Sequence, residues 1–370
     1  MSLDERLDLY AVKTQFERFT NLLDLAGIAA DVGFLRRARR TLLPLPLVDR
    51  PQRFDSTNVF PTFQERPVPA LARKRVALVA SGGGGAAVSL VGVARAFEEA
   101  GVEPAEIVGC SGGAIWGAMW AAGMSSDEMA EFCLSWDPAD YLDIRWLSLP
   151  RFALSALRGF TGLAKGEAIE QLFDRRLVGM RCADTPIPIT TIVYNMDLGT
   201  LEYFGSTRTP DVSLGHLVRV AIALPLFIES VRVGEHLYVD GGIIENWPAE
   251  PAIEDDFDHV FGVNLMLPAG FRPKDITGWP DRTGGILEAS RQLQQGYHLE
   301  LARRAMRHLG NRLTLVEPVE ASETRGTSFY DLFIDRSHWP RLMRQGYEAA
   351  TEALDGFRSM RQPAVGAGRR

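Results

Sequence analysis

Ser111 lies in the pattern Gly109-x-Ser111-x-Gly113, between an apolar run that ends at Gly109 and a helix-forming run over residues 114–122. This pattern predicts a strand, a sharp turn with the serine at its apex, and a helix whose N-terminus points at the hydroxyl. Glycines suit such a turn because a Cβ there would collide with the neighbouring strand or helix. A hydroxyl presented in this way can attack a substrate carbonyl, so Ser111 is the candidate nucleophile.

A run of glycines, Gly82 to Gly85, follows an apolar strand over residues 75–80, one strand–helix unit before the serine. Its bare backbone N–H groups could serve three chemistries. A dinucleotide site fits Gly82-x-Gly84-x-x-Ala87 loosely, but it also requires an acidic residue at the end of the second strand, where the serine turn stands instead. A phosphate-binding P-loop would need Gly-Lys-Ser/Thr, which is absent. Beside a serine turn, an oxyanion hole is the best interpretation.

Asp240 ends a short strand-like run and is followed by Gly241 and Gly242. An Asp-Gly pair usually marks a turn. Residues 243–248 do not form a hairpin return, however, which favours a positioned carboxylate that acts as the base.

A Ser–Asp–His triad is the alternative catalytic machinery, because histidines follow Asp240 in the chain order of the α/β-hydrolases. The candidates are His259, His298, His308 and His338. None of them lies in a glycine-rich turn at the end of a strand, so the sequence favours a two-residue dyad over a triad.

The elements that carry these residues alternate between strand and helix. The strand at 75–80, the helix at about 86–100 and the strand that begins at residue 107 form a βαβ unit, which places both turns at the carboxyl edge of one parallel sheet. Further strands are expected at 187–194, 200–204, 238–240, 259–265 and 313–317, and helices at about 165–177, 217–223, 285–309 and 345–357. The fold class is therefore α/β with a mainly parallel central sheet.

Three regions are predicted along the chain: a helical and proline-rich N-terminal extension over residues 1–70, one catalytic domain over 71–357, and a disordered tail over 358–370. Within the extension, residues 33–40 place arginines beside an apolar flank. They either contact an anionic membrane surface or complement the dipole at the end of a helix.

A long apolar stretch within residues 123–185 has two interpretations. It could form a lid or an acyl-chain groove, because lipid tails need apolar walls, or it could pack on the core.

Composition narrows the function classes. The net charge of −7 argues against a nucleic-acid partner. The three cysteines form no CxxC pair and no metal-ligand cluster, which suits a reducing cytoplasm, and no metal or cofactor is expected. The chain does not begin with a secretory signal, and no apolar run reaches the roughly 18 residues of a membrane span. A cytoplasmic protein, soluble or peripherally attached to a membrane, is expected.

In their order and spacing, these motifs resemble the patatin-like phospholipases, over about residues 71–357. The resemblance implies a three-layer α/β/α fold and a lipid acyl hydrolase that forms an acyl-enzyme intermediate. The implied site residues are the dyad Ser111 and Asp240, an oxyanion hole from Gly82, Gly83, Gly84 and Gly85, and supporting glycines Gly109, Gly113, Gly241 and Gly242. This chain departs from the family where Ala86 and Ala87 replace a basic residue and a glycine that the family often has.

Two alternative functions share the same features. The chain could be a catalytically weak homologue that binds a lipid or a partner, or an acyltransferase, because the acyl enzyme is common to hydrolysis and transfer. The motifs do not specify the lipid, the acyl position or the oligomeric state.

Overall fold

The computed structural model describes residues 58–143, 162, 164–225, 227–265, 285–319, 332 and 336–359. The expected helices before residue 58, the arginine-rich stretch 33–40, the apolar stretch 144–161 and the tail beyond 359 lie outside the described residues.

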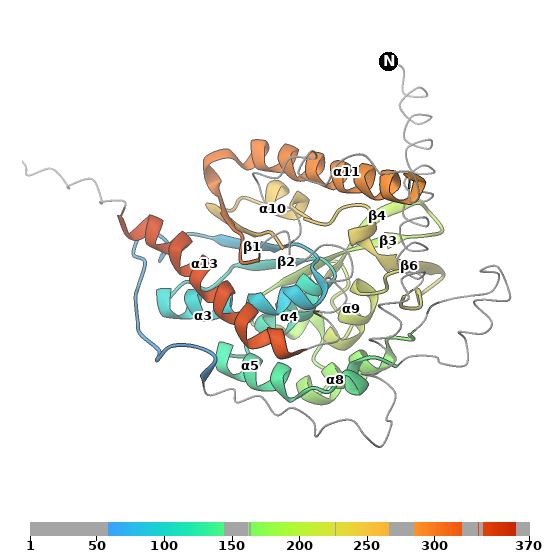
Figure 1. The fold of residues 1–370 in the computed structure, drawn as a ribbon, viewed down its shortest axis with the longest axis horizontal. Helices are drawn as coiled ribbons and strands as arrows, with labels where there is room; N and C mark the ends of the chain where they lie inside the picture. Colours follow the sequence, from blue (N-terminus) through green and yellow to red (C-terminus); the bar gives the residue numbers. More distant parts are fainter. Residues whose placement is uncertain are drawn as a thin grey trace, which may run out of the picture.

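The described part of the chain forms an eight-stranded sheet in the order β5-β6-β3-β2-β1-β7-β8, with β4 paired to β3 (Figure 1). The strands are β1 (Val76–Ala80), β2 (Glu106–Gly109), β3 (Ile189–Asn195), β4 (Thr200–Gly205), β5 (Val231–Val233), β6 (His236–Asp240), β7 (His259–Val263) and β8 (Leu313–Val316). The pairs from β3 through β2, β1 and β7 to β8 are parallel, whereas β4, β5 and β6 pair antiparallel. The predicted mainly parallel sheet is confirmed.

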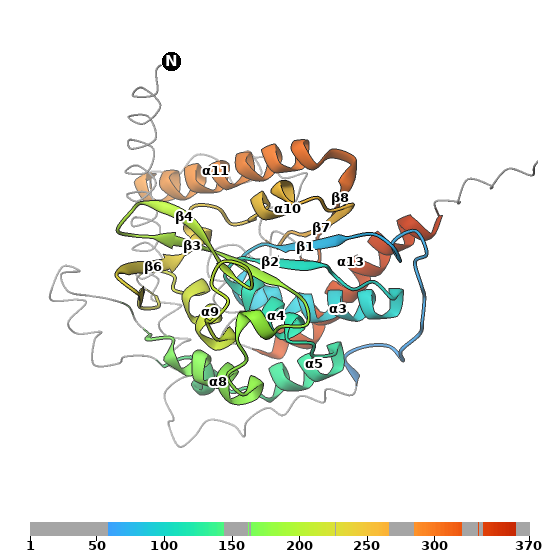
Figure 2. The same cartoon turned by 180° about the vertical axis from the view of Figure 1, so that it is seen from behind.

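Helices cover both faces of this sheet, so the molecule has three layers (Figures 1 and 2). Over one face lie α10 (Glu250–Glu254) and α11 (Gly285–Leu309). Over the other lie α3 (Ser89–Ala100), α4 (Gly112–Ala121), α9 (Leu214–Ala221) and α13 (Trp339–Ser359), with α5 (Ser126–Ser135), α6 (Pro138–Tyr141) and α8 (Glu167–Leu177) further out. The expected α/β/α architecture is present.

The alternation of side chains along β1 explains why an unbroken apolar run forms its central strand. Val76, Leu78 and Ala80 belong to the core on the side of α3 and α4, and Ala77 and Val79 belong to the core on the side of α10 and α11. All five are fully buried. A strand buried on both faces must be apolar at every position, unlike a strand with one solvated face.

Two glycines let α13 lie directly on α3. A Cβ at Gly92 would collide with the backbone of Met343 and Tyr347, and one at Gly346 would collide with the backbone of Ser89. The final helix begins at Trp339, before the predicted start at residue 345, and covers the helix that follows the glycine loop.

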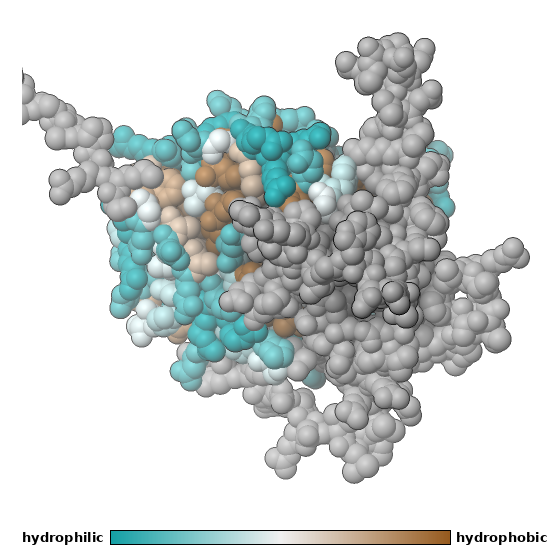
Figure 3. All heavy atoms as spheres, turned by 45° about the horizontal axis from the view of Figure 1, so that its top comes forward, coloured by the Kyte–Doolittle hydropathy of each residue, from teal (hydrophilic) through white to brown (hydrophobic). Residues whose placement is uncertain are grey.

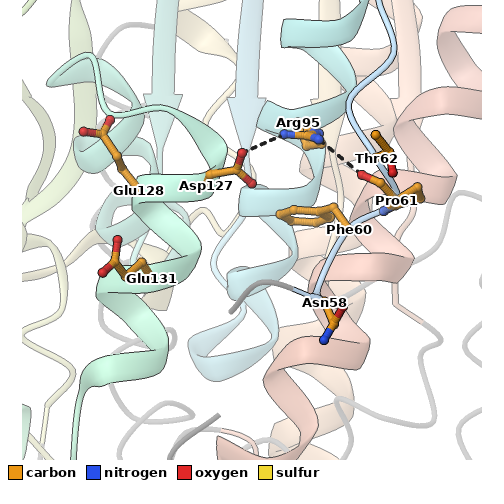
Figure 4. Close-up of a pocket in the computed structure, with 8 residues that line it drawn as sticks. All are labelled: Asn58, Phe60, Pro61, Thr62, Arg95, Asp127, Glu128 and Glu131. Carbon is orange, nitrogen blue, oxygen red and sulfur yellow. Dashed lines mark hydrogen bonds and ion pairs between the residues drawn. The ribbon is translucent and has the colours of Figure 1, made fainter. Parts of the chain in front are cut away.

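The described unit extends past both ends of the predicted domain 71–357. Val59 and Val68 are buried in the main core, and Arg95 of α3 donates to the carbonyl of Pro61 and to Asp127 of α5 (Figure 4). At the other end α13 continues through Ser359. The domain boundaries stay predictions.

In the coloured part of Figure 3, hydrophilic residues surround an apolar area to the left of the centre of the view. The large apolar side chains exposed in the described part of the chain are Phe63, Val178, Met196 and Leu198. Among the described helices, none combines the length and the apolar character needed to cross a bilayer.

Candidate active site

Strand pairing brings the predicted nucleophile and the predicted base together. On β3, Thr191 pairs with Gly109 of β2, and Val193 pairs with Asp240 of β6. Because β4 pairs along the whole of this stretch, it occupies one edge of β3, and β2 and β6 must share the other edge. The two strands run toward each other and end on either side of Ile192. Ser111 follows the end of β2, so it meets Asp240 at this junction.

The turn at Ser111 is strained in the way that the motif predicts. Ser111 has φ 47° and ψ −119°, a backbone conformation that L-residues seldom adopt, and it is the N-cap of α4. A Cβ at Gly109 would lie 2.9 Å from the Cα of Ala114, and one at Gly113 would lie 2.7 Å from the carbonyl oxygen of Ala80. Both glycines are therefore required by close backbone contacts.

Asp240 is 2% exposed, and groups from the serine turn and from its own loop surround its carboxylate. The N–H of Gly242 donates to Oδ1 at 2.8 Å, Sγ of Cys110 lies 3.9 Å from the same oxygen, and the Ser111 side chain lies close enough to stabilise the ionised carboxylate. Burial is the largest effect on this group and raises the pKa of Asp240 to about 6, although the neighbouring Ser111, Gly242 and Cys110 oppose the rise. A carboxylate with this pKa is a stronger base than an ordinary aspartate.

The Asp-Gly-Gly sequence fits the junction closely. A Cβ at Gly241 would lie 2.8 Å from the carbonyl carbon of Ile192, and one at Gly242 would lie 3.0 Å from Oδ1 of Asp240. Side chains at these positions would push Asp240 away from the serine turn.

The glycine loop lies beside Ser111. A Cβ at Gly82 would be 3.2 Å from the Cβ of Ser111. Gly84 opens the short 3₁₀ helix η2 (Gly84–Val88), and the N–H of Ala86 bonds to the carbonyl of Gly83 at 3.0 Å. Because Ala86 is the donor that closes this first turn, the preceding N–H groups have no partner inside η2.

Gly82 differs from the other glycines of the loop. Its N–H donates to the backbone carbonyl of Asn246 at 3.0 Å, so this predicted oxyanion donor is engaged within the protein. The bond instead ties the glycine loop to the segment that follows Asp240.

Ala86 and Ala87, which replace the basic residue and the glycine often found in the family, are both fully buried. A Cβ at Gly112 would lie 3.0 Å from the Cβ of Ala87. This part of the loop therefore faces α4 and not the solvent.

Cys110 is a neighbour of Asp240 that the sequence did not indicate. Its buried Sγ lies 3.9 Å from Oδ1 of Asp240 and 3.8 Å from the carbonyl oxygen of Glu245. Burial and the nearby carboxylate of Asp240 raise the pKa of Cys110 well above its usual range, so the thiol stays protonated. The sequence feature that could have indicated this contact is the position of Cys110 next to Ser111, at the end of the strand that meets β6.

The histidines of the triad alternative lie elsewhere. His259 begins β7, near the edge opposite Ser111, and its Nε2 bonds to Oγ1 of Thr314 at 2.9 Å. His298 of α11 donates from Nε2 to the carbonyl of Ile243 at 3.4 Å. The remaining two, His308 and His338, are exposed. Within the described residues, no histidine is among the hydrogen-bond partners of Asp240.

The described residues contain no group of three or more histidines, cysteines, aspartates or glutamates placed to hold a metal ion. The site as described is built from a hydroxyl, a carboxylate and backbone amides.

Several known proteins are similar to parts of this chain. Residues 78–253 match the family described as patatin-like phospholipase. The chain is 26% identical to YqhO of Bacillus subtilis over 242 residues, which cover 60% of this chain and 82% of YqhO. It is 30% identical to the NTE family protein Rv1063c of Mycobacterium tuberculosis over 206 residues, which cover 54% of this chain and 53% of the relative.

A solved structure with a similar fold is VipD from Legionella pneumophila, with 14% identity and a TM-score of 0.45 over 77% of this chain and 67% of VipD. The matched segment, residues 78–253, contains the glycine loop, the serine turn and Asp240. The segment over residues 78–253 is therefore similar to the patatin-like phospholipase family.

Proposed function

We propose that the protein hydrolyses carboxylic esters of lipids, as a phospholipase A, lysophospholipase or esterase, with Ser111 as nucleophile and Asp240 as base. The observation that carries this proposal is the convergence of Ser111 and the buried carboxylate of Asp240 at the point where β2 and β6 meet, close enough for the Ser111 side chain to lower the pKa of that carboxyl against the effect of burial. The family description supports a lipid ester as the substrate class.

In the first half of the reaction, the Ser111 hydroxyl gives its proton to Asp240 as Oγ attacks the ester carbonyl. The tetrahedral intermediate then collapses, and the leaving alcohol takes the proton from Asp240. In the second half, Asp240 takes a proton from water, which attacks the acyl enzyme, and Ser111 recovers its hydrogen when the acid leaves. The dyad returns to its starting state, so no cofactor is consumed.

The N–H groups of Gly83, Gly84 and Gly85 are the proposed donors to the oxyanion. They precede the first donor of η2, and the loop adjoins Ser111. Fixed donors of this kind need no rearrangement as negative charge develops, and removing one costs other enzymes about 100- to 1,000-fold in rate. Gly82 is left out of this set because its N–H already bonds to Asn246.

The pH profile of kcat/KM is expected to show the ionisation of the Asp240 carboxyl group. Burial raises the pKa of Asp240 to about 6, and only the ionised carboxylate can accept the proton of Ser111. Activity should therefore be constant above this pH and fall by about tenfold per pH unit below it. Rates on an uncharged ester between pH 4.5 and 9 measure this.

Glu245→Gln is the control for that profile, because burial also raises the pKa of Glu245, to about 7. The control should leave the inflection near pH 6 in place. An inflection that disappears in Glu245→Gln, or one that lies near 4 in the wild type, would contradict the assignment to Asp240.

The function itself is tested with a panel of phospholipids, lysophospholipids and neutral esters, with products identified by mass spectrometry and Ser111→Ala as the blank. Release of free fatty acid by the wild type alone supports hydrolysis. Transfer of the acyl group to an added alcohol or lysolipid, in preference to water, would instead make the protein an acyltransferase.

Labelling with a fluorophosphonate separates these reactions from a binding role. The proposal requires stoichiometric modification of Ser111, because the reagent depends on an activated serine. No labelling at any detergent concentration would favour a catalytically weak lipid-binding homologue. The cytoplasmic location and a peripheral membrane contact stay predictions.

A further inference from the structure

Ser81 is a fully buried serine between β1 and the glycine loop, and its hydroxyl connects two backbone groups. Oγ accepts from the N–H of Leu265 at 2.9 Å and donates to the carbonyl oxygen of Gly82 at 3.2 Å. The N–H of Ser81 bonds to the carbonyl of Val263 at 3.0 Å, so Ser81 is held against the end of β7. The hydroxyl is thus a fixed donor to the first peptide of the loop.

That peptide joins Gly82 to Gly83, and its orientation decides where a proposed oxyanion donor points. The described peptide bonds are all trans, so the N–H of Gly83 points opposite to the carbonyl of Gly82. Holding the Gly82 carbonyl toward Ser81 therefore turns the Gly83 N–H away from Ser81. Glycines allow such a peptide to rotate more freely than other residues do, because no Cβ restricts φ and ψ.

The bonds around this peptide leave the Ser81 hydroxyl as the group that selects its orientation. The N–H of Gly82 is held by the Asn246 carbonyl, and the carbonyl of Gly83 is held by the N–H of Ala86. These bonds fix the peptides on either side. The bond from Ser81 fixes the peptide between them.

We propose that Ser81 is a positioning residue for the oxyanion hole, whose hydroxyl holds the Gly82–Gly83 peptide so that the Gly83 N–H serves the reaction. This inference rests on the proposed function and adds a residue to it. Ser81 does not touch the reacting atoms, and it acts through the peptide that it bonds.

Ser81→Ala removes the hydroxyl, leaves the Gly82 carbonyl and the Leu265 N–H without this partner, and frees the peptide to rotate. Displacing one donor should lower kcat for a short-chain ester by about 100-fold, the lower end of the range for losing an oxyanion donor. KM should stay within about threefold, because the groups that bind the ester are unchanged.

Fluorophosphonate labelling separates positioning from partial unfolding. The rate constant of labelling should fall by the same factor as kcat, since the reagent also develops charge on an oxygen. The final stoichiometry should stay at one label per chain. A reduced stoichiometry with an unchanged rate constant would mean that Ser81 only supports the fold, and would overturn the proposal.

Ser89→Ala is the matched control. Ser89 is also fully buried, but its hydroxyl has no hydrogen-bond partner among the described residues, so its removal should leave kcat and the labelling rate unchanged. If Ser81→Ala does not fold, Ser81→Cys fills the same space with a much weaker donor and should show the same loss.

The outcomes distinguish this inference from the function on which it rests. A wild-type protein that is not labelled would overturn both. A labelled wild type whose rate equals that of Ser81→Ala, or of folded Ser81→Cys, would overturn the role of Ser81 and leave the proposed function standing.

Discussion

Asp240→Asn is expected to lower kcat on a chromogenic ester by about 100- to 10,000-fold, the range over which a positioned base contributes to catalysis. Asparagine has nearly the same shape, and its amide oxygen can still accept from the N–H of Gly242, which now bonds to Oδ1 at 2.8 Å. It cannot take the proton of Ser111. The loss should therefore appear in kcat, with little change in KM.

The same substitution should not destabilise the protein at pH 8. Burial raises the pKa of Asp240 to about 6. Because the ordinary value is near 4, the folded protein binds the proton more tightly than the unfolded chain between about pH 4 and 6, and the free energy of unfolding falls as pH rises through this window. Above it, the ionised carboxylate costs the fold up to about 3 kcal/mol. The neutral amide avoids this cost.

Melting temperatures at pH 8 and pH 4 measure this effect beside kcat. We expect Asp240→Asn to melt at the same temperature as the wild type or higher at pH 8, with the difference shrinking at pH 4. A variant that is inactive and also melts far below the wild type at pH 8 would have lost its fold, and would not support the assignment of the base.

His298→Ala is the control for the triad alternative. His298 bonds to the carbonyl of Ile243 and so lies nearer to the Asp240 segment than the strand histidine His259 does. The dyad predicts that His298→Ala retains most of the activity. If this change abolished turnover and Asp240→Asn did not, the dyad would be wrong.

The residues of the candidate site could be predicted because their sequence signals are local. Glycines flank Ser111 two residues away on each side, and two glycines follow Asp240. Such glycines indicate turns whose backbones approach another segment of the chain. The structure shows those approaches at Ala80, Ala114 and Ile192. The unbroken apolar run of β1 likewise indicates a strand that is buried on both faces of the sheet.

What the sequence could not supply is the pairing that joins the two motifs. Nothing near Asp240 shows that β6 runs antiparallel to β3 and shares an edge with β2, because this depends on β4 having taken the other edge. The hydrogen-bond partner of the Gly82 N–H could not be predicted either, because it too depends on a segment distant in the sequence. This N–H bonds to Asn246, far along the chain, and so four similar glycines have different roles.

The reactivity of Cys110 could not be predicted from the sequence either. A cysteine beside a nucleophile suggests reactivity, but its reactivity depends on its surroundings. Here burial and the carboxylate of Asp240 raise the pKa of the thiol, and Sγ lies against Oδ1 of Asp240 and the backbone of Glu245. The group helps to fill the space behind Asp240 and stays in its protonated form.

Gly112→Ala is expected to lower kcat by about 100- to 1,000-fold without removing any reactive group, because it displaces an oxyanion donor. A Cβ at Gly112 would lie 2.6 Å from the carbonyl oxygen and 2.8 Å from the nitrogen of Gly84. Both contacts are with backbone, so the loop must shift and cannot relieve the overlap by rotating a side chain. The shift moves the Gly84 N–H relative to Ser111.

Gly117→Ala is the matched control on the same helix, α4. Its Cβ would contact only side-chain atoms, Cγ2 of Ile107 at 3.1 Å and Cδ1 of Ile189 at 4.0 Å. Alanine is also the better helix former by about 1 kcal/mol, which offsets the tighter packing. The control should keep wild-type kcat.

Full fluorophosphonate labelling of Gly112→Ala at a slow rate would place the damage in the oxyanion hole, because the dyad would still be assembled. Equal kcat in the two variants would mean that the Gly84 N–H does not hold the oxyanion, and that the donors must be sought elsewhere in the loop.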